Sequence, residues 1–431
     1  LSVAVMLLTS CILFPPEQAP FDAVRDLSEE LPVFPGAVGF GSTTVAGRGG
    51  EILRVTSLAN DGEGSLRSAL EQEGPRIVVF EVGGVIELAS SIVVRTPYLT
   101  LAGQTAPDPG ITLRGSGIVV STHDVLIQHI RSRPGDSTAG EDPNDRDGIG
   151  VVGSPRGDVD VYNVVIDHCS VSWAIDEGAS TWHEGVRDIT FSNNIIAENL
   201  SESLHSKGEH SKGLLIGDHS RRISVIGNLF AHNMRRNPLL KGDTSSFIAN
   251  NVIYNPGTQA VGFSNPERSG YSISTIVHNL FISGPDTAGS AAIWRGRETS
   301  NAIEVFLEGN RVSESAGLAP VVPPQNIAAV TVGSAPVSIL PFAPVAIAEL
   351  EEHVLAGAGS RPSARDTVDE RIVQTVRDRN GAIIDSQNDV GGYPAPSPTS
   401  AGLDIPADPH GDDDDDGYSN VEEWLHGLAG Q

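Results

Sequence analysis

Cationic side chains gather between residues 203 and 241 in a chain whose formal net charge is -27. This basic segment holds seven of the chain's 28 lysines and arginines: Lys207, Lys212, Arg221, Arg222, Arg235, Arg236 and Lys241. Four histidines are interleaved with them: His205, His210, His219 and His232. Cations clustered on an otherwise acidic protein are useful where an anion has to be admitted. The segment therefore predicts an anion-binding site, with a solvated basic face of no particular role as the alternative. The net charge argues against nucleic acid as that anion.

A second set of candidate ligands lies near the C-terminus, in residues 412–423. Counted from Asp412, this loop has Asp at positions 1, 3 and 5, Gly at 6, Asn at 9 and Glu at 12. That spacing matches the calcium loop of an EF-hand, in which oxygen donors converge on one cation because the glycine makes a sharp turn. The candidate ligands are Asp412, Asp414, Asp416, Tyr418, Asn420 and Glu423. An acidic solvated tail is the alternative, because no complete helix precedes the loop.

The first eleven residues form an apolar run that ends in small residues and a cysteine. This pattern predicts an export signal, and the run is too short to span a bilayer. Residues 8–11 also resemble a bacterial lipoprotein box, which would make Cys11 a site for a lipid anchor. We therefore expect a secreted, periplasmic or cell-surface protein, with residues 1–20 as signal segment and linker. Cys169 is then left without a disulfide partner and is predicted to be a buried free thiol.

An internal repeat predicts the architecture that positions these groups. A short apolar run followed by Asn or an equivalent residue ends at positions 130, 169, 194, 228, 251, 279 and 310. Periods of this length indicate a solenoid, and the 47 glycines with only 5% aromatic residues favour short strands joined by tight turns. The sequence therefore predicts an all-β parallel β-helix, in which the asparagines stack at one turn and Cys169 occupies the same column.

Insertions and caps follow from the same repeat. The two longest intervals hold an acidic loop at 136–147 and much of the basic segment, and insertions in a solenoid often lie on the binding face. Residues 61–70 resemble a turn followed by a short amphipathic helix that would cap the N-terminal end. Residues 313–349 are expected to be extended chain or linker, and residues 366–392 to pack back on the body.

Several longer motifs carry a family resemblance. They are residues 34–41 (FPGAVGFG), 77–84 (IVVFEVGG), 101–107 (LAGQTAP), 166–173 (IDHCSVSW), 210–217 (HSKGLLIG), 236–238 (RNP) and 384–392 (IDSQNDVGG). Together they resemble secreted bacterial pectate lyases over most of residues 33–395. The resemblance implies a right-handed parallel β-helix that binds Ca²⁺ and cleaves polygalacturonate by β-elimination to unsaturated oligouronides. We expect a monomer with a lyase domain at 33–395 and a calcium-binding tail at 404–431.

The resemblance also implies roles for individual residues. Arg236 matches the arginine taken as the base, and Lys212 and Lys241 match cations that hold substrate carboxylates, with Lys241 standing where an arginine is common. Arg235, His210 and Lys207 are expected to contact the same acidic polysaccharide.

The cleft calcium is assigned to Asp147, Asp176 and Glu177. A further acid that the pattern calls for is missing, because residues 178–182 offer only Ser180 and Thr181.

Other functions stay open from the sequence. Solenoids of this kind also serve as non-catalytic carbohydrate-binding proteins. A polygalacturonase-type hydrolase would need close pairs or trios of Asp and no calcium, and a lyase for another uronate polymer is a further alternative. Ultraviolet absorbance separates these classes, because elimination creates a conjugated double bond and hydrolysis does not.

Overall fold

The computed structural model describes residues 24–138, 140–266, 270–299, 302–313, 321, 323–395 and 397–430. The predicted export segment and Cys11 lie outside these residues. Within them, no helix combines the length and apolar character needed to cross a membrane.

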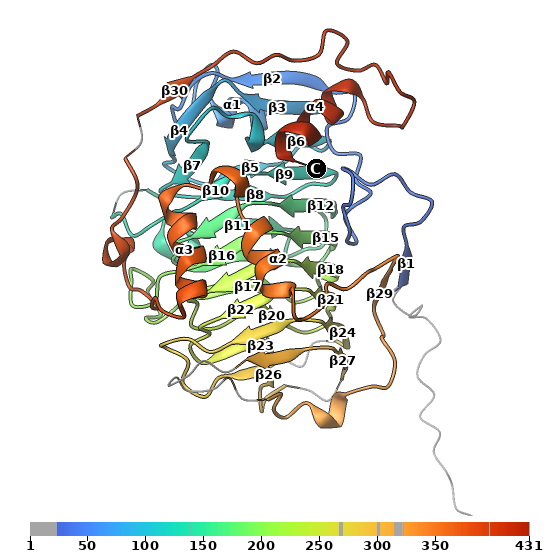
Figure 1. Cartoon of the computed structure of the whole chain (residues 1–431), viewed down its shortest axis with the longest axis vertical. Coiled ribbons are helices and arrows are strands. Elements are labelled where there is room, and N and C mark those ends of the chain that lie inside the picture. Colours follow the sequence, from blue (N-terminus) through green and yellow to red (C-terminus); the bar gives the residue numbers. More distant parts are fainter. Residues whose placement is uncertain are drawn as a thin grey trace, which may run out of the picture.

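Three long sheets wind around one core as a parallel β-helix, which confirms the predicted fold (Figure 1). Sheet 1 contains β2 (Glu51–Val55), β3 (Arg76–Phe80), β6 (Leu99–Ala102), β9 (Val125–Gln128), β12 (Val161–Asp167), β15 (Val186–Ser192), β18 (Arg221–Ile226), β21 (Ser245–Ala249), β24 (Ser272–Val277) and β27 (Ile303–Glu308). Sheet 2 contains β4 (Val82–Glu87), β7 (Ile111–Arg114), β10 (Arg131–Ser132), β13 (Ser170–Ser172), β16 (Ile195–Ala197), β19 (Leu229–Ala231), β22 (Val252–Tyr254), β25 (Leu280–Ile282), β28 (Arg311–Ser313) and, at its edge, β30 (Thr399–Ser400). Sheet 3 contains β5 (Ile92–Val94), β8 (Ile118–Val120), β11 (Ile149–Val152), β14 (Glu177–Trp182), β17 (Lys212–Ile216), β20 (Leu239–Leu240), β23 (Gln259–Phe263) and β26 (Ala291–Arg295).

The interior is built from columns of apolar residues at one register position of successive coils. In sheet 1 the column Ile127, Ile166, Phe191, Val225, Ile248 and Ile276 follows the parallel pairing of the strands, and every member is buried. Full burial of such a side chain stabilises the fold by about 1.5–3 kcal/mol. Because each coil buries its apolar side against its neighbours, the coils stabilise one another rather than folding alone.

The predicted asparagine column is present at the turn between sheets 1 and 2. The side-chain amide of Asn194 donates to Asn228 at 2.9 Å, Asn228 donates to Asn251 at 3.0 Å, and the chain of bonds continues through Asn279 to Asn310. Cys169 heads this column, where its backbone N–H donates to Asn194 Oδ1 at 2.8 Å. It is a buried free cysteine, as predicted, and burial raises the pKa of its thiol to about 12.

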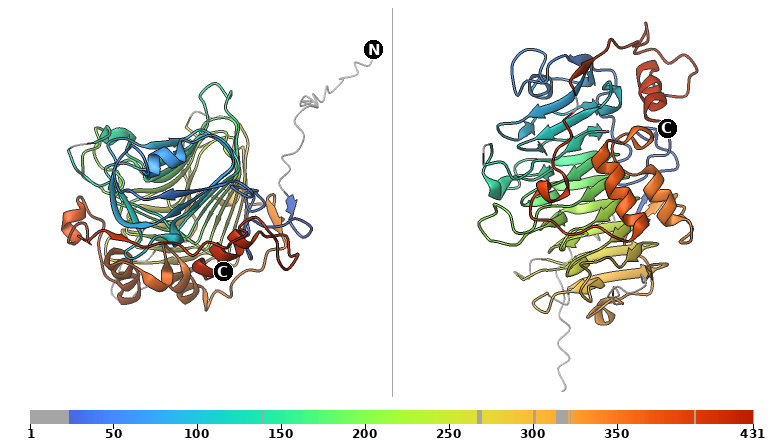
Figure 2. Two further views of the ribbon diagram at one scale, coloured as in Figure 1. Left: turned by 90° about the horizontal axis from the view of Figure 1, so that it is seen from above. Right: turned by 60° about the vertical axis from the view of Figure 1, so that its left-hand side comes forward.

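Short elements close the ends of the solenoid. Helix α1 (Leu66–Leu70) caps the N-terminal end as predicted, with Ser65 as N-cap and Leu66 and Leu70 in the main core (Figure 2). At the other end η3 (Ala328–Val330) places Ile327 and Val330 in the same core. Strand β29 (Ser338–Leu340) pairs with β1 (Val24–Asp26) in a small parallel sheet.

The C-terminal part of the chain runs back along the outside of the solenoid (Figure 1). Helices α2 (Leu350–Gly357) and α3 (Thr367–Asp378) cover the outer face of sheet 2, and the 3₁₀ turns η4 (Pro362–Ala364) and η5 (Gln387–Val390) flank α3. Helix α4 (Asn420–Ala429) lies on the outer face of sheet 1, near the 3₁₀ turn η1 (Gly103–Thr105). The sequence predicted that residues 366–392 pack back, but it did not predict the helices α2 and α3.

Candidate active site

The candidate catalytic side chains lie at or just before the N-terminal ends of neighbouring strands of sheet 3. Asp147 lies just before β11, Asp176 and Glu177 at the start of β14, and Lys212 at the start of β17. The backbone of Glu177 pairs in register with that of Lys212 on the neighbouring strand. Lys212 in turn forms an isolated backbone β-bridge with Arg235 on the next coil. Parallel strands lie about 4.8 Å apart, so this register stacks an acid and two cations at one end of the sheet.

Asp147, Asp176 and Glu177 form a carboxylate cluster in which one oxygen of each lies within 4.8 Å of the others. Asp147 is fixed from both sides: Oδ1 accepts from the Glu177 N–H at 2.9 Å and Oδ2 accepts from the Ser180 hydroxyl at 2.9 Å. Burial raises the pKa of Asp147 well above its ordinary value, and the charges of Glu177 and Asp176 raise it further. Burial also raises the pKa of Glu177, against the opposing charge of Arg236.

These clustered oxygens fit a hard divalent cation, because Ca²⁺ prefers carboxylate ligands and would relieve their mutual repulsion. Ser180, which stands among the residues where a further acid was expected, instead holds Asp147 in place.

Two cations lie against the carboxylate cluster. The guanidinium Nη1 of Arg236 forms an ion pair with Glu177 Oε1. Lys212 Nζ lies 3.5 Å from Asp176 Oδ1 and 3.8 Å from Glu177 Oε1. Burial, with the charge of Arg236 as the next largest cause, lowers the pKa of Lys212 to about 8. Both predicted catalytic residues, Arg236 and Lys212, are therefore brought together with the predicted calcium ligands.

A second asparagine column, which sequence reasoning missed, supports the turn that carries Arg236. Asn199 Nδ2 donates to Asn233 Oδ1 at 3.1 Å, and Asn233 Nδ2 donates to Asn237 Oδ1 at 3.1 Å. Arg236 itself has a left-handed backbone with φ +63°. A left-handed non-glycine residue costs free energy and persists where its surroundings hold it, which is common at functional sites. The signal in the sequence was a second recurrence of Asn, five residues after Asn194 and Asn228.

The loop before β17 carries the predicted substrate contacts His210 and Lys207. Lys207 is exposed, whereas the ring of His210 is only 3% exposed and its Nε2 lies 3.2 Å from Asp176 Oδ1. Burial lowers the pKa of His210 to about 4. A direct contact between His210 and substrate does not follow from this geometry, so that role stays a prediction. Arg235 donates from Nη2 to the Glu209 carbonyl at 3.4 Å.

The two insertion loops lie beside the site, as expected for insertions of a solenoid, and hydrogen bonds join them to each other. The Ser206 N–H and hydroxyl donate to Asn144 Oδ1 at 3.0 and 2.6 Å. Asn144 belongs to η2 (Pro143–Asp145), within the acidic loop that precedes Asp147. The buried guanidinium of Arg146 supports the same loop by donating to the carbonyls of Gly135 and Ser137 at 2.9 and 2.8 Å.

Lys241 lies away from the carboxylate cluster. Its Nζ is 2.9 Å from Asp218 Oδ2 and 5.0 Å from the centroid of the Trp182 ring, at the far end of β14 from Glu177. Five residues of strand at about 3.3 Å each separate the two ends of β14 by roughly 16 Å. Lys241 is therefore separate from the carboxylate cluster, and its neighbours Trp182 and Asp218 were not anticipated from the sequence.

The predicted C-terminal calcium ligands Asp412, Asp414 and Asp416 come together on the outside of sheet 1. Their carboxylate oxygens lie within 4.8 Å of one another, and the Gly417 N–H donates to Asp412 Oδ2 at 3.0 Å. Glu423, the predicted ligand at position 12, is not a member of this close group. Desolvation and the charges of the neighbouring aspartates raise its pKa.

Two other members of the predicted C-terminal set make contacts through their side chains. The Tyr418 hydroxyl donates to the Pro32 carbonyl at 3.0 Å, and Asn420 Nδ2 donates to the Asp408 carbonyl at 2.8 Å. The loop is therefore anchored to the N-terminal segment that precedes β2 and to the residues just before the loop itself.

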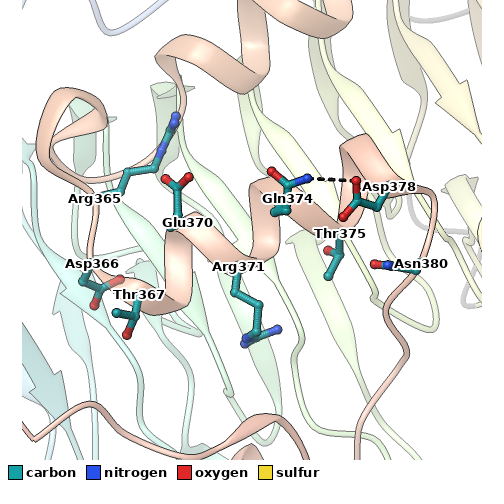
Figure 3. Close-up of a pocket in the computed structure, with 9 residues that line it drawn as sticks. All are labelled: Arg365, Asp366, Thr367, Glu370, Arg371, Gln374, Thr375, Asp378 and Asn380. Atoms are coloured by element: carbon teal, nitrogen blue, oxygen red, sulfur yellow. Dashed lines mark hydrogen bonds between the residues drawn. The ribbon is translucent and has the colours of Figure 1, made fainter.

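A pocket of about 580 Å³ lies elsewhere, along α3 (Figure 3). It is lined by charged and polar side chains of α3 and its flanks, among them Glu370, Arg371 and Gln374, and Gln374 donates to Asp378 at 2.8 Å. None of its lining residues belongs to the carboxylate cluster or the cations around it. The pocket lies on the outer face of sheet 2, whereas the candidate active site lies at one end of sheet 3.

The three coiled sheets place the chain among parallel β-helix proteins, and carboxylates and cations gather together at one end of its sheet 3. No protein-family model matches the chain. A probable pectate lyase C of Aspergillus flavus is 34% identical over 421 residues, covering 93% of this chain and 94% of that protein. The chain belongs to the pectate lyase family. This relative is fungal, and the expected likeness to bacterial members gains no support from it.

Solved structures agree with the fold. The cedar pollen allergen jun a 1 superimposes with a TM-score of 0.55 at 20% identity, covering 75% of this chain and 92% of that one. A pectate lyase bound to a hexasaccharide superimposes with a TM-score of 0.53 at 15% identity, covering 77% and 98%.

Proposed function

We propose that this chain is a calcium-dependent lyase that cleaves polygalacturonate by β-elimination. The observation that carries the proposal is the carboxylate cluster of Asp147, Asp176 and Glu177 packed against Lys212 and Arg236. The cluster offers oxygen ligands for a cation, and the adjacent side chains offer positive charge for an anionic substrate. A polygalacturonase-type hydrolase is less well supported, because the acids of this site are each paired with a cation or held by a hydrogen bond.

The reaction removes the proton at C5 of a uronate, breaks the C4–O4 bond and leaves a C4=C5 double bond, while O4 gains a proton. Asp147, Asp176 and Glu177 would hold Ca²⁺, which when bound neutralises the substrate carboxylate and so makes the C5 proton more acidic. Arg236 is the proposed proton acceptor, held in position by the second asparagine column. Lys212 is proposed to bind the carboxylate and to stabilise the charge that develops on it.

An arginine base must lose its own proton first, and the ordinary pKa of arginine is about 12.5 or higher. Lys212 is the second candidate for the base, because its pKa of about 8 leaves a substantial neutral fraction in mildly alkaline solution.

Three further cationic residues are proposed to bind the substrate. Lys241, beside Asp218 and over Trp182, is proposed to bind the carboxylate of a more distant sugar. Lys207 is exposed and Arg235 lies on the adjoining coil, so both are proposed to attract and orient the acidic polysaccharide.

The tail is proposed to bind a separate Ca²⁺ that orders α4 on the solenoid. Its helix buries Val421 and Leu425 against Ile77 and Val79 of β3, and Arg48 pairs with Glu422 at 2.8 Å. The division into a lyase domain at 33–395 and a tail at 404–431 belongs to this proposal, as does a monomeric state. Secretion, with or without a lipid on Cys11, is proposed from the apolar start of the sequence.

Absorbance of the conjugated product during incubation with polygalacturonate tests the function. We expect absorbance to rise with calcium and to stop when a chelator is added. Reducing ends released without that absorbance would instead indicate a hydrolase, and binding without either signal a non-catalytic protein. A panel of other uronate polymers and of methylated pectin identifies the preferred substrate.

A further inference from the structure

Two buried histidines face the carboxylate cluster from the loop before β17. The rings of His205 and His210 stack with centroids 3.4 Å apart and planes 23° apart, and their side chains are 1% and 3% exposed. The Nε2 atoms of both rings are buried without a hydrogen-bond partner. They lie 3.6 Å and 3.2 Å from the same atom, Asp176 Oδ1.

The hydrogen bonding of His210 fixes where its ring proton lies. His210 Nδ1 is 2.9 Å from the Gly208 carbonyl, which can only accept, so Nδ1 carries the proton. In the neutral ring Nε2 then carries no proton and presents only a lone pair. The atom that it faces, Asp176 Oδ1, is a carboxylate oxygen and also presents only lone pairs. Two such lone pairs repel each other unless a cation lies between them. Lys212 Nζ, 3.5 Å from the same oxygen, offsets part of the charge of Asp176, and an ion between Nε2 and Oδ1 would bind both lone pairs directly.

The spacing of the three atoms fits a small transition-metal ion. One ligand atom of each of Asp176, His205 and His210 lies within 4.8 Å of the other two. Two ligands about 2.0–2.1 Å from a tetrahedral zinc ion are roughly 3.3 Å apart. The observed separations of 3.2 and 3.6 Å from Asp176 Oδ1 lie close to that value.

We propose that Asp176, His205 and His210 form a binding site for a transition-metal ion of the zinc class, which shares Asp176 with the all-carboxylate cluster but adds two imidazole ligands. Imidazole nitrogen suits Zn²⁺, Co²⁺ and Ni²⁺, whereas Ca²⁺ takes oxygen ligands, so the two sites select different ions. Three protein ligands leave the fourth tetrahedral position for water or another group.

Loading the site requires one local rearrangement. The Lys207 N–H donates to His205 Nδ1 at 3.0 Å, which leaves the ring proton of His205 on Nε2. For Nε2 to bind a metal, this proton must move to Nδ1 and the Lys207 amide must turn away. Residues Lys207 and Gly208 are exposed and Gly208 has a left-handed backbone with φ +79°, so the turn has room to change.

Asp176 belongs to both groups, and that sharing links the two sites. An ion held by the histidines draws the Asp176 carboxylate away from Asp147 and Glu177. On the proposed function, a transition-metal ion therefore weakens calcium binding at the carboxylate cluster, and by reciprocity Ca²⁺ weakens the binding of that ion.

The test uses Co²⁺ and Zn²⁺ with the full-length protein after chelator treatment and dialysis. Co²⁺ reports tetrahedral nitrogen and oxygen ligation through its visible absorption, and calorimetry with Zn²⁺ gives affinity and stoichiometry. We expect one saturable Co²⁺ site whose absorption is lost on adding Zn²⁺, and excess Ca²⁺ should raise the Co²⁺ concentration needed to saturate it because Asp176 belongs to both groups. His205→Ala and His210→Ala should each lower the Zn²⁺ affinity by about tenfold or more, since even indirect changes around a metal commonly cost that much.

His219→Ala is the matched control, because His219 also pairs with an aspartate, Asp243, at 2.9 Å but lies outside the cluster. His210→Gln keeps a polar side chain if the alanine variant does not fold, and melting curves establish folding for each variant. Unchanged metal affinity in His205→Ala and His210→Ala, or no Co²⁺ site in the wild type, would overturn the proposal. Asp147→Asn should abolish lyase activity yet retain the Co²⁺ absorption, so a failure of the proposed function is distinguished from a failure of the metal site.

Discussion

The guanidinium of Arg236 forms an ion pair with the carboxylate of Glu177, so the proposed proton acceptor and a proposed calcium ligand bind each other. A cation that takes up Glu177 competes with this pair and makes the Arg236 side chain available to substrate. On the proposed function, calcium binding by Glu177 and release of the Arg236 side chain are therefore linked through this one carboxylate.

Replacement of Arg236 tests its role as the base. Arg236→Ala should lower kcat by about 10²–10⁴, the usual contribution of general-base catalysis, while circular dichroism and melting temperature stay near those of the wild type. Arg236→Lys should fail as well, because lysine lacks the planar fork of arginine. More than about a tenth of the wild-type activity in Arg236→Ala would remove Arg236 from this role.

Asp147→Asn tests the carboxylate cluster with little change of shape. The asparagine oxygen still accepts from the Glu177 N–H and its amide donates to Ser180, whereas alanine would leave both groups unpaired. Calcium-dependent activity should be lost, by about a hundredfold or more if the metal supplies several kcal/mol of transition-state stabilisation.

The same variant should be more stable than the wild type in calcium-free buffer at neutral pH. The pKa of Asp147 is raised above 3.8 in the folded protein, so its ionisation destabilises the fold increasingly as pH rises through the folded pKa. Melting curves in the presence of a chelator at several pH values measure the difference in melting temperature between Asp147→Asn and the wild type. This difference should shrink toward pH 4. An Asp147→Asn protein that melts below the wild type at pH 7 would contradict this account.

Lys212 gives a pH dependence with a definite sign. Its pKa of about 8 means that its positive charge is lost as pH rises through that value. If Lys212 holds a substrate carboxylate, kcat/KM should fall above pH 8, and Lys212→Arg should move the fall to higher pH because arginine stays charged. A kcat/KM that instead rises through pH 8, and vanishes in Lys212→Arg, would make Lys212 the base.

The second asparagine column predicts a difference between two similar substitutions. Asn233→Ala and Asn251→Ala each remove a buried amide from an asparagine ladder and should each cost about 1–3 kcal/mol of folding free energy. Because Asn233 bonds to Asn237 beside Arg236, Asn233→Ala should also lower activity, by about tenfold or more, at a temperature where both variants are folded. Equal activities would mean that the column does not position the base.

The C-terminal loop should affect stability and leave catalysis unchanged. In Asp412→Ala and Glu423→Ala, calcium should no longer raise the melting temperature by the full wild-type amount, and the shortfall should be a few degrees. Activity at moderate temperature should be retained. These variants are preferable to truncation after residue 402, which would expose Ile77 and Val79 under α4. Loss of activity in a folded Asp412→Ala protein would show that the tail contributes to the active site.

The recurrence of apolar runs and asparagine was enough to predict the β-helix, because each coil repeats the same local pattern and stacks on an identical neighbour. Cys169 was placed correctly for that reason, since its column position determines its burial. The EF-hand spacing of Asp412, Asp414 and Asp416 likewise predicted a local cluster that lies within a few residues of chain.

The tertiary structure alone decided which distant side chains meet. Lys212 and Lys241 both belong to the basic segment, yet register places Lys212 beside Glu177 and Lys241 beside Trp182 at the other end of the strand. The meeting of His205 and His210 over Asp176 depends on how an insertion loop folds across its neighbour, and no local pattern encodes that path. Sequence periodicity determines which residues share a column, whereas loop conformation and side-chain direction determine which columns and loops come into contact.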